Sequence, residues 1–362
     1  MMQIKIIKKG VNNMALTKGE LAQRQSLPLE AKIIKSIKTI EKFYDMYDGD
    51  VYISRGGVDS AIVQWLADQS CYKIQGVCVA GVEPVENIKY NKEQGNVLLG
   101  STTSKKKVIE DWGYPLINKM VAMAISRYTR TKHEWVKERR LNGYMGRNGK
   151  WIYDGRIPAK YRELIYAPFE LSEKCCDKTK KKPLHDWEMK NGKPKPITGE
   201  MAVESDSRMV NYLKHGCIMD SKSKVKCTPI GFWTAQDVME CIYVHKIPIP
   251  EIYGEVIKNE DGTFRYSGEQ RTGCEICGFG IMHDTERYER LKERKPGIYN
   301  EMMRGGKWIR KDLYRWVKFR PGSIPIWSNL YFVPDDKGYG YRFVLNYFYK
   351  VMKIDKYIEK IE

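Results

Sequence analysis

The sequence predicts an α/β fold with a mostly parallel, doubly wound sheet and a largely helical C-terminal region. Two observations lead to this class. Residues 51–53 form a short apolar run that breaks at Gly56 and Gly57, and residues 61–67 continue as a helix. A second apolar run at residues 74–80 is expected to be the next strand. Strands that alternate with helical segments in this way are typical of a parallel sheet with helices on both faces.

The remaining elements follow in chain order. Residues 1–28 are expected to be a basic, irregular extension, and apolar residues at helical spacing over 29–47 predict an amphipathic helix. A third strand is expected at residues 114–119, followed by a helix from 120 to about 128. We therefore divide the chain into three parts. They are the extension of residues 1–28, a domain of residues 29–245 built on the predicted strands, and a C-terminal region of residues 246–362 with a basic, aromatic tail that includes Trp308, Phe319, Tyr341 and Phe348.

Composition is that of a soluble globular protein. Of 362 residues, 42% are hydrophobic and 30% charged, and no stretch resembles a membrane span or a signal peptide. We expect a cytoplasmic protein with no membrane partner. The formal net charge of +18 favours a nucleic acid or a strongly anionic small molecule as partner. A lysine-rich, AT-biased genome would explain the same charge.

The loop of residues 54–60 is the first candidate site. Glycines between a strand and a helix allow positive φ and close backbone approach, and the helix N-terminus then offers N–H groups to a phosphate. Asp59 or Ser60 could cap the helix or position the ligand. Glu83 lies in a turn after the second strand, at the sheet edge where α/β proteins bind ligands. Both segments have a simpler explanation as ordinary turns.

Residues 129–165 interleave arginine and lysine with tryptophan and tyrosine. Basic side chains contact phosphates and aromatic rings stack on bases, so this stretch is a candidate nucleic-acid or substrate surface. A charged stretch can equally be a solvated surface with no ligand.

The nine cysteines indicate a metal centre rather than disulfides, because the cytosol keeps thiols reduced. Cys175 and Cys176 are adjacent, and Cys274 and Cys277 form a C-x-x-C pair. Four thiolates in two pairs suit a [4Fe–4S] cluster or a tetrahedral zinc site. Adjacent cysteines are unusual around a small ion, which favours the cluster. Cys71, Cys78 and Cys241 are expected to be small hydrophobic residues.

Several motifs occur in one order along residues 30–300. Gly-Gly-x-Asp-Ser ends at Ser60, Lys-Cys-Cys is followed by Lys180, Glu-Ser-x-x-Arg ends at Arg208, and Arg-x-Gly-Cys-x-x-Cys ends at Cys277. This order resembles the PAPS/adenylylsulfate reductase family of the PP-loop, adenine-nucleotide alpha-hydrolase-like superfamily, in its iron–sulfur branch.

The resemblance implies where the ligands bind. It assigns the [4Fe–4S] cluster to Cys175, Cys176, Cys274 and Cys277, and the nucleotide phosphates to Ser54, Gly56, Gly57, Asp59 and Ser60, with Glu83 beside them. Asp59, Lys180 and Arg208 are the residues expected to take part in the chemistry. Arg55 stands where the PP-loop pattern has its first serine, so it either adds a phosphate contact or marks a loop that no longer hydrolyses ATP.

The reaction is the least determined part. Reductases of this family carry a catalytic cysteine in a C-terminal Glu-Cys-Gly-Leu-His segment, and this sequence has no cysteine after Cys277. We therefore expect ATP-dependent, pyrophosphate-releasing sulfur transfer to a nucleic acid, with Mg²⁺ and a sulfur-donor protein. The ATP pyrophosphatase of DNA phosphorothioation is the analogue. One alternative is a PAPS or adenylylsulfate (APS) reductase that uses Cys217, Cys227 or a thiol-reductant partner. The other is a non-catalytic module that binds a nucleotide or nucleic acid.

Overall fold

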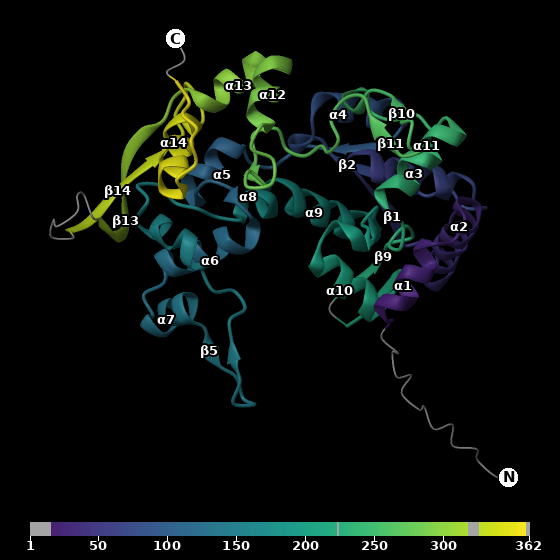
Figure 1. Ribbon diagram of the computed structural model, residues 1–362, viewed down its shortest axis with the longest axis horizontal. Coiled ribbons are helices and arrows are strands. Elements are labelled where there is room, and N and C mark those ends of the chain that lie inside the picture. Colours follow the sequence, from purple (N-terminus) through teal and green to yellow (C-terminus); the bar gives the residue numbers. More distant parts are fainter. Residues whose placement is uncertain (1–15, 223, 318–325, 360–362) are drawn as a thin grey trace. The chain divides into compact units, whose positions relative to one another are not determined.

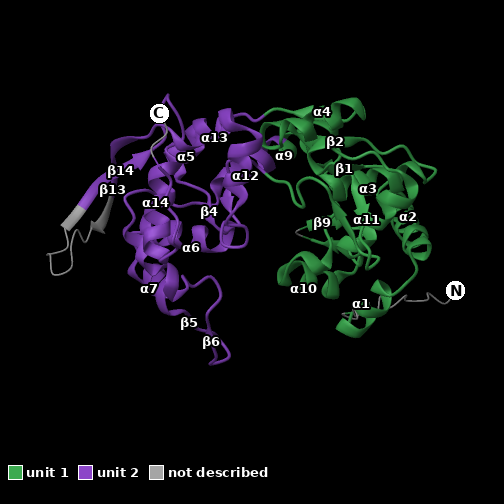
Figure 2. Ribbon diagram, turned by 45° about the horizontal axis from the view of Figure 1, so that its top comes forward, with its two compact units in different colours: residues 1–100, 184–273 green, residues 101–183, 274–362 purple. Residues whose placement is uncertain are grey.

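The computed structural model describes residues 16–222, 224–317 and 326–359, and these form two compact units (Figures 1 and 2). Unit 1 joins the residues up to Gly100 to Leu184–Gly273, and unit 2 joins Ser101–Pro183 to the residues from Cys274 on. The chain therefore passes from one unit to the other three times. The three consecutive parts expected from the sequence do not coincide with these interleaved units. Phe319 and residues 1–15 lie outside the described residues.

Unit 1 is built on a six-stranded sheet in the order β3-β2-β1-β7-β9-β8. Neighbouring strands are parallel throughout except for β8 and β9, which are antiparallel. The mostly parallel α/β sheet is thus confirmed. The strands are β1 (Val51–Arg55), β2 (Gly76–Val79), β3 (Val97–Leu99), β7 (Lys195–Ile197), β8 (Ile218–Ser221) and β9 (Lys224–Cys227).

The strand order places a switch point in the middle of this sheet. From β1 the chain adds β2 and β3 on one side, and later adds β7 and β9 on the other. The carboxyl ends of β1 and β7 therefore flank the position where the order reverses, which is where open α/β sheets bind ligands.

Seven helices accompany this sheet in the described part of the chain. They are α1 (Lys18–Gln25), α2 (Leu29–Met46), α3 (Val58–Asp68), α4 (Val85–Glu93), α9 (Lys182–Asn191), α10 (Asp206–His215) and α11 (Ala235–His245). Short 3₁₀ turns η1 (Ala80–Val82), η4 (Ala202–Glu204) and η5 (Glu251–Tyr253) and the hairpin of β10 (Val256–Lys258) and β11 (Phe264–Tyr266) complete the unit. The extension expected to be irregular contains α1, because Thr17 and Glu20 form a capping box that starts a helix.

The predicted amphipathic helix is α2, which buries Ile33, Ile40 and Phe43 on its inner face. Its Lys32 is also buried, and the Lys32 Nζ lies 2.6 Å from a carboxylate oxygen of Asp237 on α11. This ion pair links two helices inside the apolar core of unit 1.

Unit 2 has its own hydrophobic core, and its described residues form no large sheet. Its helices are α5 (Lys105–Trp112), α6 (Lys119–Arg130), α7 (Glu134–Asn142), α8 (Lys174–Cys176), α12 (Arg287–Arg294), α13 (Pro296–Met303) and α14 (Tyr341–Met352), with the 3₁₀ segment η2 (Ala159–Tyr166) and the π-helical segment η3 (Asp177–Lys181). Its strands pair as β4 (Leu116–Ile117) with β12 (Gly278–Phe279), β5 (Tyr144–Met145) with β6 (Trp151–Ile152), and β13 (Lys307–Val317) with β14 (Ile326–Val333).

Two expectations change in this unit. The strand expected at residues 114–119 is only β4, and it pairs with β12 instead of joining the main sheet, whose third parallel strand on that side is β3. The C-terminal region is only partly helical, because β13 and β14 form a long antiparallel pair between α13 and α14. Within the tail, Tyr341 and Phe348 are core residues, whereas Trp308 is about half exposed. A search of the described helices for an apolar stretch of membrane-spanning length finds none.

Candidate functional site

The loop between β1 and α3 lies at the switch point of unit 1. Neither Gly56 nor Gly57 has positive φ, so the glycines are not needed for a left-handed turn as the sequence suggested. They are needed because the side chains of Tyr253 and Glu83 lie close to the backbone of the loop. A Cβ on Gly57 would lie 2.2 Å from the Tyr253 hydroxyl, and one on Gly56 would lie 3.3 Å from a carboxylate oxygen of Glu83.

Ser60 holds the loop in shape. The Gly56 N–H donates to the Ser60 Oγ at 2.9 Å, and the Ser60 hydroxyl donates to the Gly57 carbonyl at 2.7 Å. Ser54, by contrast, lies within β1, where it pairs with Val77 of β2. The loop and the start of α3 therefore contain Gly56, Gly57, Asp59 and Ser60, whereas Ser54 belongs to the preceding strand β1.

The Arg55 side chain holds the loop in place by hydrogen bonds. This side chain is buried and donates to the Ser60 carbonyl and, at 3.1 Å, to the Asn91 Oδ1, while its guanidinium lies 5.6 Å from the ring centre of Tyr90. Asn91 in turn donates to the Gly56 carbonyl at 3.2 Å. Arg55 thus ties β1 and α3 to α4.

Tyr253 and Thr272 also reach the loop, which the sequence did not indicate. The Tyr253 hydroxyl accepts from the Val58 N–H at 3.3 Å and lies 2.5 Å from the Thr272 Oγ1. The N-terminus of α3 has no side-chain cap of its own, so Tyr253 satisfies one of its free N–H groups. Only the position of Thr272 beside the C-x-x-C motif marked this region in the sequence.

Segments after β7 and β2 complete the surroundings of the loop. A Cβ on Gly199 would lie 2.7 Å from the carbonyl carbon of Asp59, so the turn after β7 packs against the first turn of α3. Glu83 follows η1, accepts from the Asn87 Nδ2 at 3.1 Å, and borders Gly56. The turn predicted at Glu83 does lie beside the loop.

Charged side chains gather at Asp59. The pKa of Asp59 is raised to about 6 by burial and, to a smaller extent, by the nearby Glu204, while Arg208 and Arg271 act in the opposite direction. Glu204 forms an ion pair with Arg208 and lies 4.0 Å from Arg271. Arg208, singled out in the sequence, is therefore close to the loop, and Arg271 is a further basic residue there. An anionic ligand would meet two arginines and the amino end of a helix.

All four cysteines of the predicted cluster belong to unit 2. Cys175 and Cys176 lie on α8, and Cys274 and Cys277 form a turn before β12 in which the Cys277 N–H donates to the Cys274 carbonyl at 3.0 Å. Burial raises the pKa of Cys175 to about 12, with Cys274 and Cys176 adding to the effect. Burial likewise raises the pKa of Cys277 to about 12, with added effects of Cys274 and Cys176. Two pairs almost 100 residues apart in the chain are thus brought together.

Protein groups hold this cysteine cluster in place. The Tyr288 hydroxyl donates to the Cys277 carbonyl at 3.0 Å, Arg287 donates to the Cys274 carbonyl at 3.3 Å, and the Thr179 hydroxyl donates to the Cys175 carbonyl at 2.7 Å. Among the described residues, no three His, Cys, Asp or Glu side chains converge closely enough to ligate one metal ion.

Lys180 lies in η3, just after the cysteine pair of α8. Lys180 belongs to unit 2, whereas Arg208 belongs to unit 1.

The cysteines proposed as alternative nucleophiles are poorly placed for that role. Cys227 is fully buried in β9, and burial raises its pKa far above the ordinary value. Burial also raises the pKa of Cys217 to about 11. Cys78 and Cys241 are buried, as expected, whereas Cys71 is exposed.

Comparison with known proteins gives one structural similarity to report. No family model and no curated protein matches the chain. The fold is similar to that of a phosphoadenylyl-sulfate (PAPS) reductase. That structure, from Candida auris in complex with phosphate, has a TM-score of 0.36 and 9% identity, over 69% of this chain and 99% of the other.

Proposed function

We propose that unit 1 binds the phosphates of an adenine nucleotide at the loop between β1 and α3, and that unit 2 holds a [4Fe–4S] cluster. The reaction is ATP-dependent, pyrophosphate-releasing sulfur transfer to a nucleic acid. The observation that carries the proposal is the strand–loop–helix at the switch point, where Arg208 and Arg271 lie near the N-terminus of α3.

Different groups around the loop would bind the phosphate oxygens, balance the phosphate charge and bind Mg²⁺. N–H groups at the start of α3 would bind phosphate oxygens, and the two arginines would balance the phosphate charge. Asp59 and Glu83 supply carboxylates on either side of Gly56 and Gly57, which suits Mg²⁺ bound together with phosphate oxygens. An acceptor oxygen of the nucleic acid would attack the α-phosphorus as the bond to pyrophosphate breaks, and sulfide from a sulfur donor would then take the place of that oxygen, which leaves with AMP.

The two cysteine pairs of unit 2 are the residues that would hold the cluster. The pKa values of the Cys175 and Cys277 thiols are raised by burial and by the thiols of Cys274 and Cys176, and hydrogen bonds hold the backbone carbonyls of Cys175, Cys274 and Cys277. Among the described residues, no three such side chains lie close enough together to ligate one ion. The adjacent pair Cys175 and Cys176 would suit two corners of a cubane better than two ligand positions of a small tetrahedral ion. When bound, the cluster would supply sulfur or electron-transfer chemistry.

Two observations favour this reaction over the alternatives. The burial of Cys227 and the raised pKa values of the Cys217 and Cys227 thiols disfavour a sulfonucleotide reductase that relies on either as its nucleophile. The hydrogen bonds of Arg55 to Asn91 and to the Ser60 carbonyl favour a supporting role for Arg55 over a disabled loop.

The test combines metal analysis with product analysis. Anaerobically purified protein should contain about four irons and four sulfides per chain. Cys175→Ser and Cys277→Ser should lose them, and Cys71→Ser, at an exposed thiol outside the cluster, should keep them. With ATP, Mg²⁺ and nucleic acid, the protein should release pyrophosphate. Sulfite release from PAPS would identify a reductase, and ATP binding without turnover a non-catalytic module. Zinc instead of iron would contradict the cluster.

A further inference from the structure

Unit 2 carries a projecting arm, defined here as residues 134–157. It consists of α7, the β5–β6 hairpin and the chain that returns to the core at Ile157 (Figure 1). Of these residues, Arg140, Gly143 and Ile157 are the buried ones. The arm therefore adds little to the hydrophobic core of unit 2.

The arm is nevertheless well ordered by hydrogen bonds. The Arg140 guanidinium donates to the Gly155 carbonyl at 2.8 Å, and the Ile157 N–H donates to the Arg140 carbonyl at 2.7 Å. At the tip, the Gly146 N–H donates to the Lys150 carbonyl at 2.8 Å, and Gly149 takes a φ of 73° that favours glycine. These bonds fix the hairpin in one shape.

Large aromatic rings face solvent on this hairpin. Trp151 is 53% exposed and Tyr153 is 55% exposed. They are two residues apart, and their rings are nearly parallel, with an interplanar angle of 13° and centres 6.3 Å apart. Side chains two apart along an extended chain lie on the same side, so the two rings form one platform. The Tyr153 ring also packs near Gly143, but more than half of each of the two residues is exposed, which suits stacking on a flat ligand.

Basic side chains surround the platform. Arg147 and Lys150, at the tip of the hairpin, are exposed and form no ion pair with any described residue. Arg156 is exposed, and its guanidinium lies 4.8 Å from the ring centre of Tyr153. The hairpin thus combines ring faces with positive charges that are available to a polyanion.

We propose that this arm binds an unpaired segment of nucleic acid. Bases stack on Trp151 and Tyr153, and Arg147 and Lys150 contact the adjoining phosphates. This deepens the proposed function, on which it rests, by naming the surface that holds the nucleic acid. An unpaired strand fits because its base faces are accessible, whereas those of a duplex are covered by neighbouring base pairs. A membrane fits poorly, because the Gly-Arg-Asn-Gly-Lys tip would enter the bilayer with its charges first.

The experiment measures binding of the full-length protein to fluorescently labelled deoxythymidine and uridine oligomers and to a mixed-sequence duplex, by anisotropy. The Trp151→Ala/Tyr153→Ala variant should bind both oligomers at least about tenfold more weakly than the wild type. Tyr357→Ala is the matched control, since Tyr357 is 73% exposed and lies outside the arm. Comparison of the two oligomers shows whether the strand is DNA or RNA.

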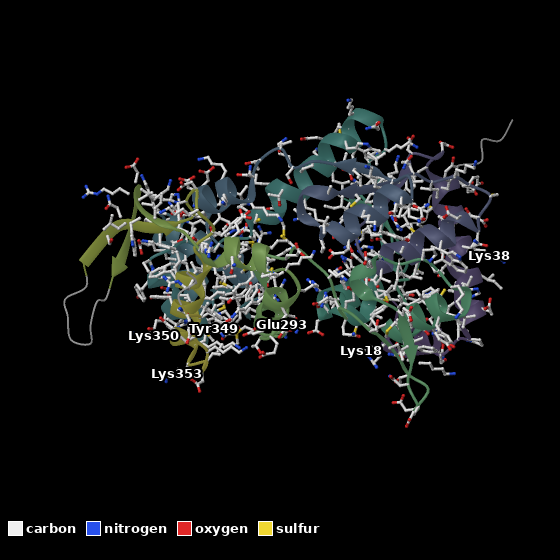
Figure 3. All side chains as sticks on the ribbon, turned by 90° about the horizontal axis from the view of Figure 1, so that it is seen from above. Lys18, Lys38, Glu293, Tyr349, Lys350 and Lys353 are labelled. Carbon is white, nitrogen blue, oxygen red and sulfur yellow. The ribbon has the colours of Figure 1, made fainter. Side chains whose placement is uncertain are left out.

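A second pair of variants tests the phosphate contacts. Arg147→Ala/Lys150→Ala should weaken binding to every oligomer and reduce the dependence of log K on log salt by about one to two units. Lys38→Ala, at an exposed lysine of α2 (Figure 3), should leave that dependence unchanged. Circular dichroism of each variant should match the wild type.

Three results would overturn the proposal: unchanged binding by both arm variants, an equal loss in the Tyr357 control, or tighter binding of the duplex than of either oligomer. Binding to phosphatidylserine vesicles without binding to the oligomers would also overturn it. Iron content and pyrophosphate release are measured on the same preparations. If the protein binds the oligomers through the arm but contains no iron and releases no pyrophosphate, this inference stands and the proposed reaction fails. Arm variants that bind normally in an iron-containing, active protein overturn this inference while the proposed reaction stands.

Discussion

Replacing Asp59 with asparagine should stabilise the protein at neutral pH. Burial raises the pKa of this carboxyl to about 6 from an ordinary value of 3.8. The folded protein therefore binds a proton more tightly than the unfolded chain, and ionisation of Asp59 above pH 6 opposes folding. Asparagine has a similar shape and no charge, so it removes this opposition.

The size of the effect follows from the shift. One pKa unit corresponds to about 1.4 kcal/mol, so a shift of this size corresponds to about 3 kcal/mol at most. Asp59 is partly exposed, and solvent screens its charge, so we expect Asp59→Asn to gain about 1 to 3 kcal/mol at pH 8. Between pH 6 and pH 4 the folded wild type takes up its proton, and the difference between the two proteins should shrink towards zero.

Urea denaturation of both proteins at several pH values measures this difference directly, because other titrating groups are shared. The wild type should gain stability relative to the variant as the pH falls from 7 to 4. A variant that is less stable than the wild type at pH 8, or a difference that does not change with pH, would refute the reasoning. Mg²⁺ and ATP should stabilise the wild type more than the variant, because only the wild type has the Asp59 carboxylate to bind them. A carboxylate that destabilises the free protein is expected where that group binds a ligand.

Two further substitutions test the packing around the loop and the core of unit 1. Gly57→Ala should weaken nucleotide binding, measured by calorimetry, because its Cβ would fall 2.2 Å from the Tyr253 hydroxyl. Gly100→Ala is the control and should bind the nucleotide normally, because no atom lies within 4 Å of its Cβ. Equal nucleotide affinities of the two variants would contradict this reasoning. Lys32→Met should cost about 3 to 5 kcal/mol in urea denaturation, because it leaves Asp237 buried without its 2.6 Å partner. A loss below about 1 kcal/mol would show that the pair contributes little.

Local patterns in the sequence were enough to predict the elements around the loop. The apolar run of β1, the two glycines and the helical spacing of α2 and α3 each have a cause within a few neighbouring residues. The strand β3 was missed because it has only three residues, none of them fully buried. The segment at residues 114–119 contains β4, whose partner β12 lies far along the chain.

The parts that could not be predicted depend on contacts between distant segments. Nothing in the residues beside Arg55 shows that Asn91 and Tyr90 receive its guanidinium. Tyr253 reaches Val58 across 195 positions of the chain. The four cysteines were identified by motif, and their spatial proximity appears only in the fold. The chain crosses between the two units after residues 100, 183 and 273, and the pairing of these distant segments appears only in the fold.

The interleaving of the two units constrains the order in which the protein can fold during synthesis. When the first 100 residues have been synthesised, only strands β1, β2 and β3 of the unit 1 sheet exist. Strands β7 and β9 are made only after residues 101–183 of unit 2. Unit 1 can close only when residue 273 has been made, and the second cysteine pair begins at the next residue. Contacts this distant in sequence slow folding and prolong exposure of unpaired strand edges to aggregation. The nascent chain should therefore depend on chaperones until its last segment is complete.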